Sequence, residues 1–267
     1  MNEGFDSFQS VWQPVLGLLP EGFYYNFFAL PLHWSEARGP VRVLVLGLGG
    51  GTAWRVLDGA APQGAELLHE GVELDPDVVE LAREHLDLPP DGPRHAARGG
   101  LDARVALAAG REPVQLAILD CYANQVEIPP HLVTVEFLRA VRDTLAPDGW
   151  LAANLGGFGL DDPLVEAVAA TCAEAFEHRV LLLRVPSSRN FVLIARRDGE
   201  LPVEGGVLRP IYDHPVGDLL RPLELPGGFR IVGPEDGTVL TDDFAPVERL
   251  QLASIREARQ RIEGASR

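Results

Sequence analysis

Glycines and carboxylates that follow apolar runs are the residues of this sequence best suited to chemistry. The first apolar run, 41–46, is followed by glycines at alternate positions: Gly47, Gly49 and Gly51. Glycine permits a positive φ and lets the backbone approach a ligand closely, where a Cβ would obstruct it. The next residues have the apolar spacing of a helix, whose free N–H groups attract an electron-rich group. This pattern predicts a nucleotide site, with a tight turn that holds no ligand as the alternative.

Two carboxylates stand at the carboxyl ends of further apolar runs. Glu73 comes 22 residues after Gly51, where an acidic residue can accept both hydroxyls of a ribose. A solvated charge at a strand end is the alternative for Glu73. Asp120 ends the run 114–119, and a carboxylate there can attract a cation and accept a proton beside a reacting centre. A purely structural role is the alternative for Asp120.

The periodicity predicts an α/β domain in which strands and helices alternate to position these residues. Strands are expected at 41–46, 66–74, 94–98, 114–120 and 150–155, and helices from 52 and at 77–86, 101–109, 132–145 and 163–176. The runs 179–185 and 190–196 are joined by only four residues, too few for a crossover helix. They therefore predict an antiparallel hairpin after a mostly parallel sheet of seven strands.

The chain is expected to divide into three segments. Residues 1–40 are rich in aromatic side chains and predict a short cover segment, 41–198 the nucleoside-binding domain, and 199–267 an irregular tail that ends in a charged helix at 247–261. Simple packing over the sheet is the alternative for the aromatic residues, in place of packing over a ligand.

Composition restricts the chemistry and the partners. The formal net charge is −16, which argues against a nucleic-acid or membrane partner and is compatible with cationic ligands. All 23 basic residues are arginine, so no lysine is present as a P-loop residue, Schiff base or nucleophile. The two cysteines and seven histidines lack metal-ligand spacing, so no metal site is predicted. A reduced cytoplasmic protein without a signal peptide or membrane span is expected.

The glycine loop lacks the third glycine of a dinucleotide fingerprint, because Thr52 occupies that position. With the hairpin, the pattern resembles the Rossmann-like fold of S-adenosylmethionine-dependent methyltransferases. In particular, a set of segments in the right order resembles the spermidine synthase (polyamine aminopropyltransferase) family, in a divergent branch. These segments are 43–52, 72–76, 102–104, 116–120, 128–132, 134–138, 145–149 and 240–247.

The resemblance implies roles for particular residues. The glycines would pack against the nucleoside, Glu73 would hold the ribose, and Asp102 with Ala103 would lie on the adenine side. Asp120 would orient an amine and help to remove its proton. Tyr122 would replace part of the contact that a second carboxylate of the same loop makes in the family, or simply pack under its loop. The implied donor is decarboxylated S-adenosylmethionine, the implied acceptor is a small amine, and a homodimer is implied.

The sequence departs from the family on the acceptor side of the pocket. Family members carry a second carboxylate three residues after the first, where this chain has Ala123, and a Y-H-E motif where it has Tyr24-Tyr25-Asn26. Residues 1–40 are also too few for the family's N-terminal β domain. Aminopropyl transfer is the first hypothesis; the alternatives are a methyltransferase that uses S-adenosylmethionine and a non-catalytic nucleoside-binding protein.

Two further groups have alternatives that the sequence leaves open. Asp242 and Asp243 would supply acidity from the tail or form a solvated turn before the last helix. His131 would approach the site from its loop or pack at a helix start.

Overall fold

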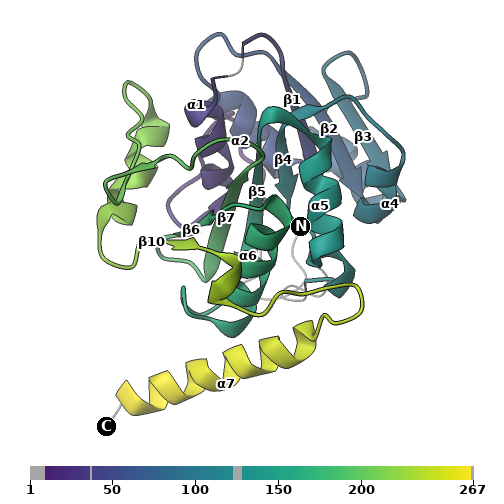
Figure 1. Cartoon of the computed structure of the whole chain (residues 1–267). Coiled ribbons are helices and arrows are strands. Elements are labelled where there is room, and N and C mark those ends of the chain that lie inside the picture. Colours follow the sequence, from purple (N-terminus) through teal and green to yellow (C-terminus); the bar gives the residue numbers. More distant parts are fainter. Residues whose placement is uncertain (1–9, 37, 123–127, 266–267) are drawn as a thin grey trace.

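A mixed eight-stranded sheet runs through the centre of the protein, in the order β10-β6-β7-β5-β4-β1-β2-β3 (Figure 1). The computed structural model describes residues 10–36, 38–122 and 128–265. The strands of the sheet are β1 (Val41–Leu46), β2 (Leu67–Glu73), β3 (His95–Gly99), β4 (Val114–Leu119), β5 (Leu145–Gly156), β6 (Val180–Arg184), β7 (Asn190–Arg196) and β10 (Phe229–Val232). The short strands β8 (Val203–Glu204) and β9 (Val207–Leu208) pair with each other.

Helices lie on both faces of this sheet (Figure 1). The α-helices are α1 (Leu30–Trp34), α2 (Thr52–Ala60), α3 (Pro76–His85), α4 (Ala103–Ala108), α5 (Val135–Thr144), α6 (Pro163–Phe176) and α7 (Val247–Ala265). The 3-10 helices are η1 (Tyr24–Ala29), η2 (Pro130–Leu132), η3 (Pro215–Glu224) and η4 (Pro234–Asp236). Among the described helices, none is both long and apolar enough to cross a membrane.

The parallel half of the sheet is built as the apolar runs predict. Strands β3, β2, β1, β4 and β5 are parallel neighbours, and crossover helices connect them. Five of the six residues of β1 are buried, because helices cover both of its faces. Parallel strands end at the same edge of the sheet, so the loops after β1, β2 and β4 meet there.

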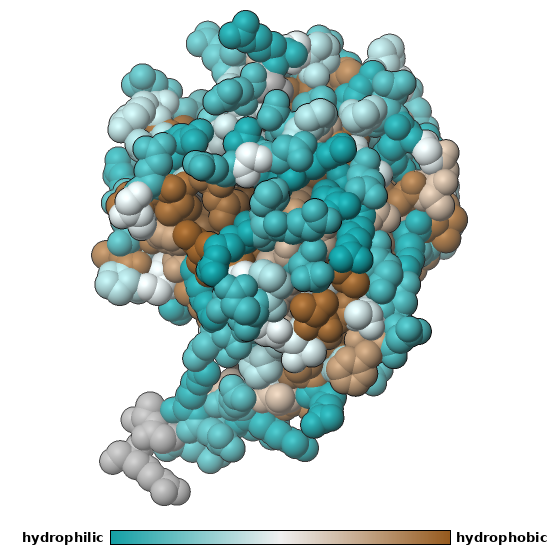
Figure 2. All heavy atoms as spheres, viewed as in Figure 1, coloured by the Kyte–Doolittle hydropathy of each residue, from teal (hydrophilic) through white to brown (hydrophobic). Residues whose placement is uncertain are grey.

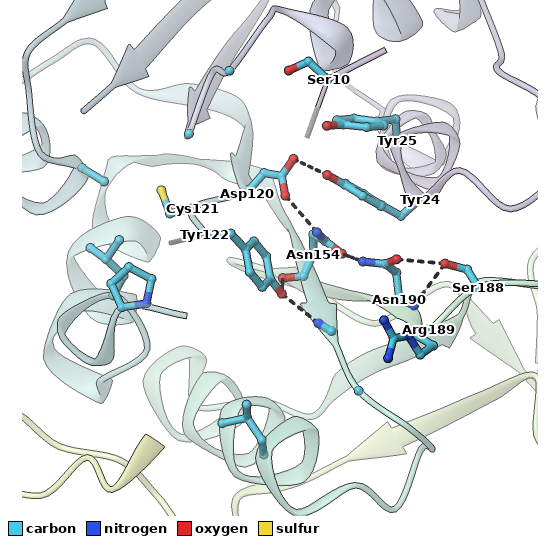
Figure 3. A pocket seen from close by; sticks show the side chains of 18 of the residues that line it. Ser10, Tyr24, Tyr25, Asp120, Cys121, Tyr122, Asn154, Ser188, Arg189 and Asn190 are labelled. Atoms are coloured by element: carbon cyan, nitrogen blue, oxygen red, sulfur yellow. Dashed lines mark hydrogen bonds between the residues drawn. The ribbon is translucent and has the colours of Figure 1, made fainter. Parts of the chain in front are cut away.

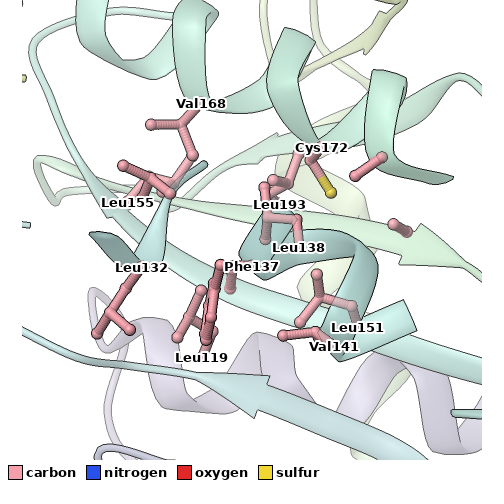
Figure 4. Close-up of a cluster of buried hydrophobic side chains, with 14 of the residues drawn as sticks. Leu119, Leu132, Phe137, Leu138, Val141, Leu151, Leu155, Val168, Cys172 and Leu193 are labelled. Carbon is pink, nitrogen blue, oxygen red and sulfur yellow. The ribbon is translucent and has the colours of Figure 1, made fainter. Parts of the chain in front are cut away.

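Two hydrophobic cores pack against the two faces of the sheet. One core joins the sheet to α4, α5 and α6, and Figure 4 shows its centre, where Phe137 and Leu138 of α5 face Val168 and Cys172 of α6. The other joins the sheet to η1, α1, α2 and α3. Trp54 of α2 is 1% exposed in that core. Apolar burial of this extent on both faces is the main force that holds the strands together.

The predicted hairpin is confirmed, since β6 and β7 pair antiparallel and β7 also pairs antiparallel with β5. The sheet has one strand more than predicted. Strand β10 comes from the tail that was expected to be irregular, and it pairs antiparallel with β6. Its four residues are too few to give a periodic signal among the surrounding prolines and glycines, and its pairing covers an edge of β6 that would otherwise be open.

The N-terminal segment and the tail pack on the same two cores as the central domain. Phe28 of η1 and Leu220 of η3 are buried in the core that contains α2. The last helix, α7, begins at the predicted residue and extends beyond the sheet (Figure 1). Hydrophilic side chains predominate on the face shown in Figure 2, and they cover most of α7 at its lower edge.

Candidate functional site

A cavity of about 1150 Å³ lies at the carboxyl ends of the parallel strands. Seven of the eight site residues predicted from the sequence line it: Gly47, Gly49, Glu73, Asp102, Ala103, Asp120 and Tyr122. Gly51 does not line the cavity. The loops that follow β1, β2 and β4 therefore meet at the edge where the parallel strands end, which is the place where open α/β sheets bind ligands.

The glycine loop turns sharply because its alternate glycines have positive φ, as expected. Gly47 has a φ of 86°, and a Cβ on it would lie 2.3 Å from the carbonyl oxygen of Asp120. Gly47 thus allows the loop after β1 to pass directly over the end of β4. Gly51 has a φ of 78° and precedes α2, where a Cβ would lie 2.5 Å from Cδ1 of Leu88. Gly51 shapes the loop without facing the cavity.

Glu73 is fixed against the glycine loop. Its Oε2 accepts a hydrogen bond from the backbone N–H of Gly49 at 2.8 Å, and its Oε1 accepts from the backbone N–H of Asp75 at 3.2 Å. Asp75 itself caps α3 by accepting from the N–H of Asp77. These contacts hold the Glu73 carboxylate at the wall of the cavity while leaving lone pairs on both oxygens for a ligand.

Asp102 caps α4 next to the predicted adenine side of the cavity. Its Oδ1 accepts from the backbone N–H groups of Arg104 and Val105, at 2.9 and 3.2 Å. Its Oδ2 lies 3.0 Å from Nε2 of His131, which also lines the cavity. His131 therefore approaches the site, and its contact with Asp102 could not be predicted from the sequence. Ala103 is buried at the start of the same helix.

Asp120 receives a hydrogen bond on each carboxylate oxygen. The Tyr24 hydroxyl donates to Oδ2 at 2.9 Å, and Nδ2 of Asn154 donates to Oδ1 at 2.9 Å (Figure 3). Burial raises the pKa of Asp120 to about 6; the hydrogen bonds from Asn154 and Tyr24 lower it, and the charge of Glu73 adds a smaller upward contribution. Asp120 is therefore mostly ionised at neutral pH yet close enough to its pKa to accept a proton.

A chain of amide groups connects Asp120 to the hairpin. Nδ2 of Asn190 donates to Oδ1 of Asn154 at 2.9 Å, and the Ser188 hydroxyl donates to Oδ1 of Asn190 at 2.8 Å (Figure 3). This series of hydrogen bonds fixes the orientation of the Asn154 amide, so its N–H₂ group faces Asp120. Asn154 is not among the site residues predicted from the sequence, although an asparagine inside the apolar run of β5 is a signal for a buried polar role.

Tyr122 binds backbone groups rather than another side chain. Its hydroxyl accepts from the N–H of Gly156 at 2.8 Å and donates to the carbonyl of Asn154 at 3.0 Å. These bonds tie the loop after β4 to the end of β5. They support a positioning role for Tyr122, and direct participation in catalysis stays a prediction.

The last helix supplies one wall of the cavity, which the sequence did not predict. Gln251, Ser254 and Ile255 of α7 line it. The Ser254 hydroxyl donates to Oδ1 of Asp162, the cap of α6, at 2.7 Å. Asp162 is 2% exposed, so this contact anchors α7 at the cavity.

The carboxylates of the tail do not reach the cavity. Asp242 forms an ion pair with Arg104 and accepts from the Thr134 hydroxyl at 2.7 Å, and neither Asp242 nor Asp243 lines the cavity. Asn26, which stands in place of the family's motif carboxylate, is buried and holds the backbone of Leu19 through bonds of 2.8 Å. Ala123 lies outside the described residues.

Comparisons with known proteins agree with this geometry. The chain is 30% identical over 263 residues to a probable polyamine aminopropyl transferase of Bifidobacterium longum (strain NCC 2705), covering 92% of this chain and 56% of the relative. It is 35% identical over 122 residues to the polyamine aminopropyltransferase of Vibrio vulnificus (strain CMCP6), covering 43% and 38%. The chain therefore spans about half, or less, of the length of these curated relatives. No family model matches.

Solved structures show the fold. A probable spermidine synthase from Corynebacterium glutamicum ATCC 13032 has a TM-score of 0.61 and 23% identity, covering 83% of this chain and 81% of that chain. Human methyltransferase-like protein 13, in complex with SAH, has a TM-score of 0.53 and 24% identity, covering 68% and 82%. The predicted resemblance and fold class are confirmed. Over most of its own length the chain is similar to the spermidine synthase (polyamine aminopropyltransferase) family, and it has the S-adenosylmethionine-dependent methyltransferase-like fold.

Proposed function

We propose that this protein is a transferase that moves the aminopropyl group of decarboxylated S-adenosylmethionine to a small amine. The observation that carries the proposal is the environment of Asp120, which shares one cavity with Glu73 and is held by Tyr24 and Asn154. In the proposed reaction, the amine nitrogen bonds to the propyl carbon next to the sulfonium. The carbon–sulfur bond breaks, and its electron pair stays on the sulfur, which becomes a neutral thioether. The amine releases a proton.

Asp120 suits the proton-transfer part of this reaction. Small alkylamines are mostly protonated at neutral pH, so an amine must lose a proton before it can attack. A carboxylate whose pKa is raised to about 6 is a better proton acceptor than an exposed aspartate, and its negative charge attracts the ammonium form. The hydrogen bonds from Tyr24 and Asn154 fix both of its oxygens, so the carboxylate keeps one orientation.

The charge of the cavity favours a cationic donor and a cationic acceptor. Among the described residues, five acidic side chains and one arginine line it. The acidic residues are Glu21, Glu73, Asp102, Asp120 and Asp162, and the arginine is Arg189. Decarboxylated S-adenosylmethionine carries a sulfonium and an ammonium group and no carboxylate. An excess of carboxylates in a partly enclosed site raises the local concentration of such a ligand.

Glu21 supports an amine acceptor although the position of the missing loop carboxylate is alanine. It lies in the segment just before η1, lines the same cavity as Asp120, and accepts a hydrogen bond from the Ser187 hydroxyl at 3.2 Å. We propose that Glu21 receives the far ammonium group of a diamine whose near amine faces Asp120. Its exposure at the rim implies a weaker contact than a buried carboxylate would make.

Methyl transfer from intact S-adenosylmethionine is the second candidate, because Arg189 lines the cavity. Its guanidinium carbon lies 5.6 Å from the ring centre of Phe158, so the planar group rests against an aromatic face. A guanidinium is a natural partner for a carboxylate. Intact S-adenosylmethionine carries that carboxylate, whereas the decarboxylated donor does not.

Calorimetric titration with four nucleosides tests the proposal. The ligands are S-adenosylmethionine, its decarboxylated form, S-adenosylhomocysteine and methylthioadenosine. We expect the decarboxylated donor and methylthioadenosine to bind at least tenfold more tightly than the other two. Tighter binding of the intact pair would favour the methyltransferase, and no binding of any of them would contradict both enzyme functions.

Matched variants locate the binding in this cavity. Glu73→Gln removes the charge from the predicted ribose site and is expected to weaken all four nucleosides by about ten- to a hundredfold, the cost of a hydrogen bond to a charged group. Glu80→Gln changes an exposed carboxylate of α3 that does not line the cavity, and it should leave the affinities unchanged. Equal affinities for Glu73→Gln and the unmodified protein would contradict the assignment of the ribose site.

A further inference from the structure

A compact polar cluster lies at the opposite end of the sheet from the cavity. His69 is near the start of β2 and His95 begins β3, and the two residues are partners in the parallel pairing. Asp58 faces them from the last turns of α2. His69 lies four residue steps along β2 from Glu73, which places the cluster roughly 13 Å from the predicted ribose site.

The donor atoms of this cluster converge. Nε2 of His69 lies 2.8 Å from Oδ1 of Asp58, and Nε2 of His95 lies 3.8 Å from Oδ2 of the same carboxylate. All three donor atoms lie within 4.8 Å of one another. Ligand atoms around a tetrahedral zinc ion stand roughly 3.3–3.5 Å apart, given bond lengths of about 2.0–2.2 Å. Shifts on the order of 1 Å would therefore complete a three-ligand site.

Two ring nitrogens of the cluster are buried and have no hydrogen-bond partner. The side chain of His69 is fully buried, and those of His95 and Asp58 are 17% and 18% exposed. Nε2 of His95, which faces Asp58, is buried without a hydrogen-bond partner, and so is Nδ1 of His69. Buried polar groups normally have partners. The imidazole rings are stacked with centroids 5.3 Å apart and lie against Trp54, so they cannot turn toward other groups without disturbing the core.

We propose that Asp58, His69 and His95 bind a divalent transition-metal ion, for which Zn²⁺ is the best match. Two imidazoles and a carboxylate are ligands that zinc commonly takes, and the fourth position would hold water. His69 and His95 also line a second cavity of about 310 Å³, which provides room for that water and a path for entry.

Arg94 is the group that a bound ion would displace. One of its guanidinium nitrogens lies 3.9 Å from Oδ1 of Asp58, and its side chain is 53% exposed. An ion pair this long and this exposed contributes little to stability, so the side chain can move toward solvent.

The ion would act as a structural clamp, since the cluster lies away from the catalytic cavity. It would join α2, which follows the glycine loop, to β2, which ends in Glu73. Sequence spacing did not predict this site, because its ligands are separated by 11 and 26 residues and come from three elements.

Metal titration of an untagged, chelator-treated protein tests the proposal. We expect one Zn²⁺ per chain in competition with a chromophoric chelator, and visible d–d absorption bands when Co²⁺ is added instead. At a free zinc concentration about a hundred times the Kd, the Tm should rise by roughly 5–10 °C. His95→Gln and Asp58→Asn should each weaken binding at least a hundredfold, whereas His85→Gln, a change at a 60% exposed imidazole of α3, should not.

Two results would overturn the proposal. One is the absence of both a saturable zinc isotherm and visible cobalt bands in the unmodified protein, which would leave a purely hydrogen-bonded cluster. The other is equal zinc affinity in His95→Gln and in the unmodified protein, which would place the ion elsewhere. The cobalt spectrum of the unmodified protein does not depend on whether a variant folds.

Discussion

Replacing Asp120 by asparagine should remove a loss of stability that the unmodified protein undergoes between pH 4 and pH 6, and should also remove the proton acceptor of the cavity. The pKa of Asp120 is about 6 in the folded protein because the carboxyl is buried, whereas it is about 3.9 in an unfolded chain. Between these values the folded state binds more protons than the unfolded state. The unmodified protein therefore loses stability from this group as the pH rises from about 4 to about 6. Asparagine does not titrate, so the variant lacks this loss.

The size of the effect follows from the shift. Two pKa units correspond to about 3 kcal/mol at 1.36 kcal/mol per unit. This value is an upper limit, because Asp120 lines a cavity that solvent can enter. The free energy of unfolding of Asp120→Asn minus that of the unmodified protein should be about 1–3 kcal/mol larger above pH 7 than at pH 4.

Urea unfolding of both proteins at one-unit steps from pH 4 to pH 8 measures this difference. The free energy of unfolding of the variant minus that of the unmodified protein should rise between pH 4 and pH 6 and then stay level. The exposed variant Glu80→Gln should follow the unmodified protein over the whole range. A difference that does not change with pH, or that falls as the pH rises, would refute the burial argument for Asp120.

Three further substitutions test the surroundings of Asp120. Tyr24→Phe removes a hydrogen bond that lowers the pKa of Asp120, so the acidic limb of the kcat/KM profile should move to higher pH by about one unit; an unchanged limb would contradict the contact. Gly47→Ala places a Cβ 2.3 Å from the Asp120 carbonyl at a φ of 86°; urea unfolding should show a loss of more than about 2 kcal/mol, and an unchanged stability would contradict the close approach. Tyr122→Phe leaves backbone groups at Gly156 and Asn154 without their side-chain partner. The free energy of unfolding should fall by about 1–3 kcal/mol, and kcat should fall more than KM changes. Loss of all activity at unchanged stability would indicate direct catalysis by Tyr122.

The parallel part of the fold was predictable because its signal is local. Strands β1 and β4 are apolar runs, β2 and β5 contain apolar stretches, and the helix after β2 begins at a recognisable residue, Pro76. Only β3, with the sequence His-Ala-Ala-Arg-Gly, has a weak signal. The carboxyl ends of parallel strands meet at one edge, so the positions of Glu73 and Asp120 at one cavity also follow from the sequence. The tail carried no such signal, and β10 became visible only through its pairing with β6.

The rest of the site depends on contacts between residues far apart in the chain. Tyr24 and Asp120 are separated by 96 positions, and Ser254 and Asp162 by 92. No periodicity along the chain records such a contact, because both partners are fixed by the packing of other elements. The cluster of Asp58, His69 and His95 is a further case, since three separate elements bring its donor atoms together.

Product analysis by mass spectrometry would show whether this cavity transfers an aminopropyl group. The protein is incubated with decarboxylated S-adenosylmethionine and a panel of small diamines, beside Asp120→Asn and Glu80→Gln. We predict equal amounts of methylthioadenosine and one aminopropylated diamine from the unmodified protein and from Glu80→Gln, and at least a hundredfold less from Asp120→Asn. Binding of the donor without an aminopropylated product from any diamine would contradict aminopropyl transfer in this cavity, and a full rate in Asp120→Asn would contradict proton transfer to Asp120.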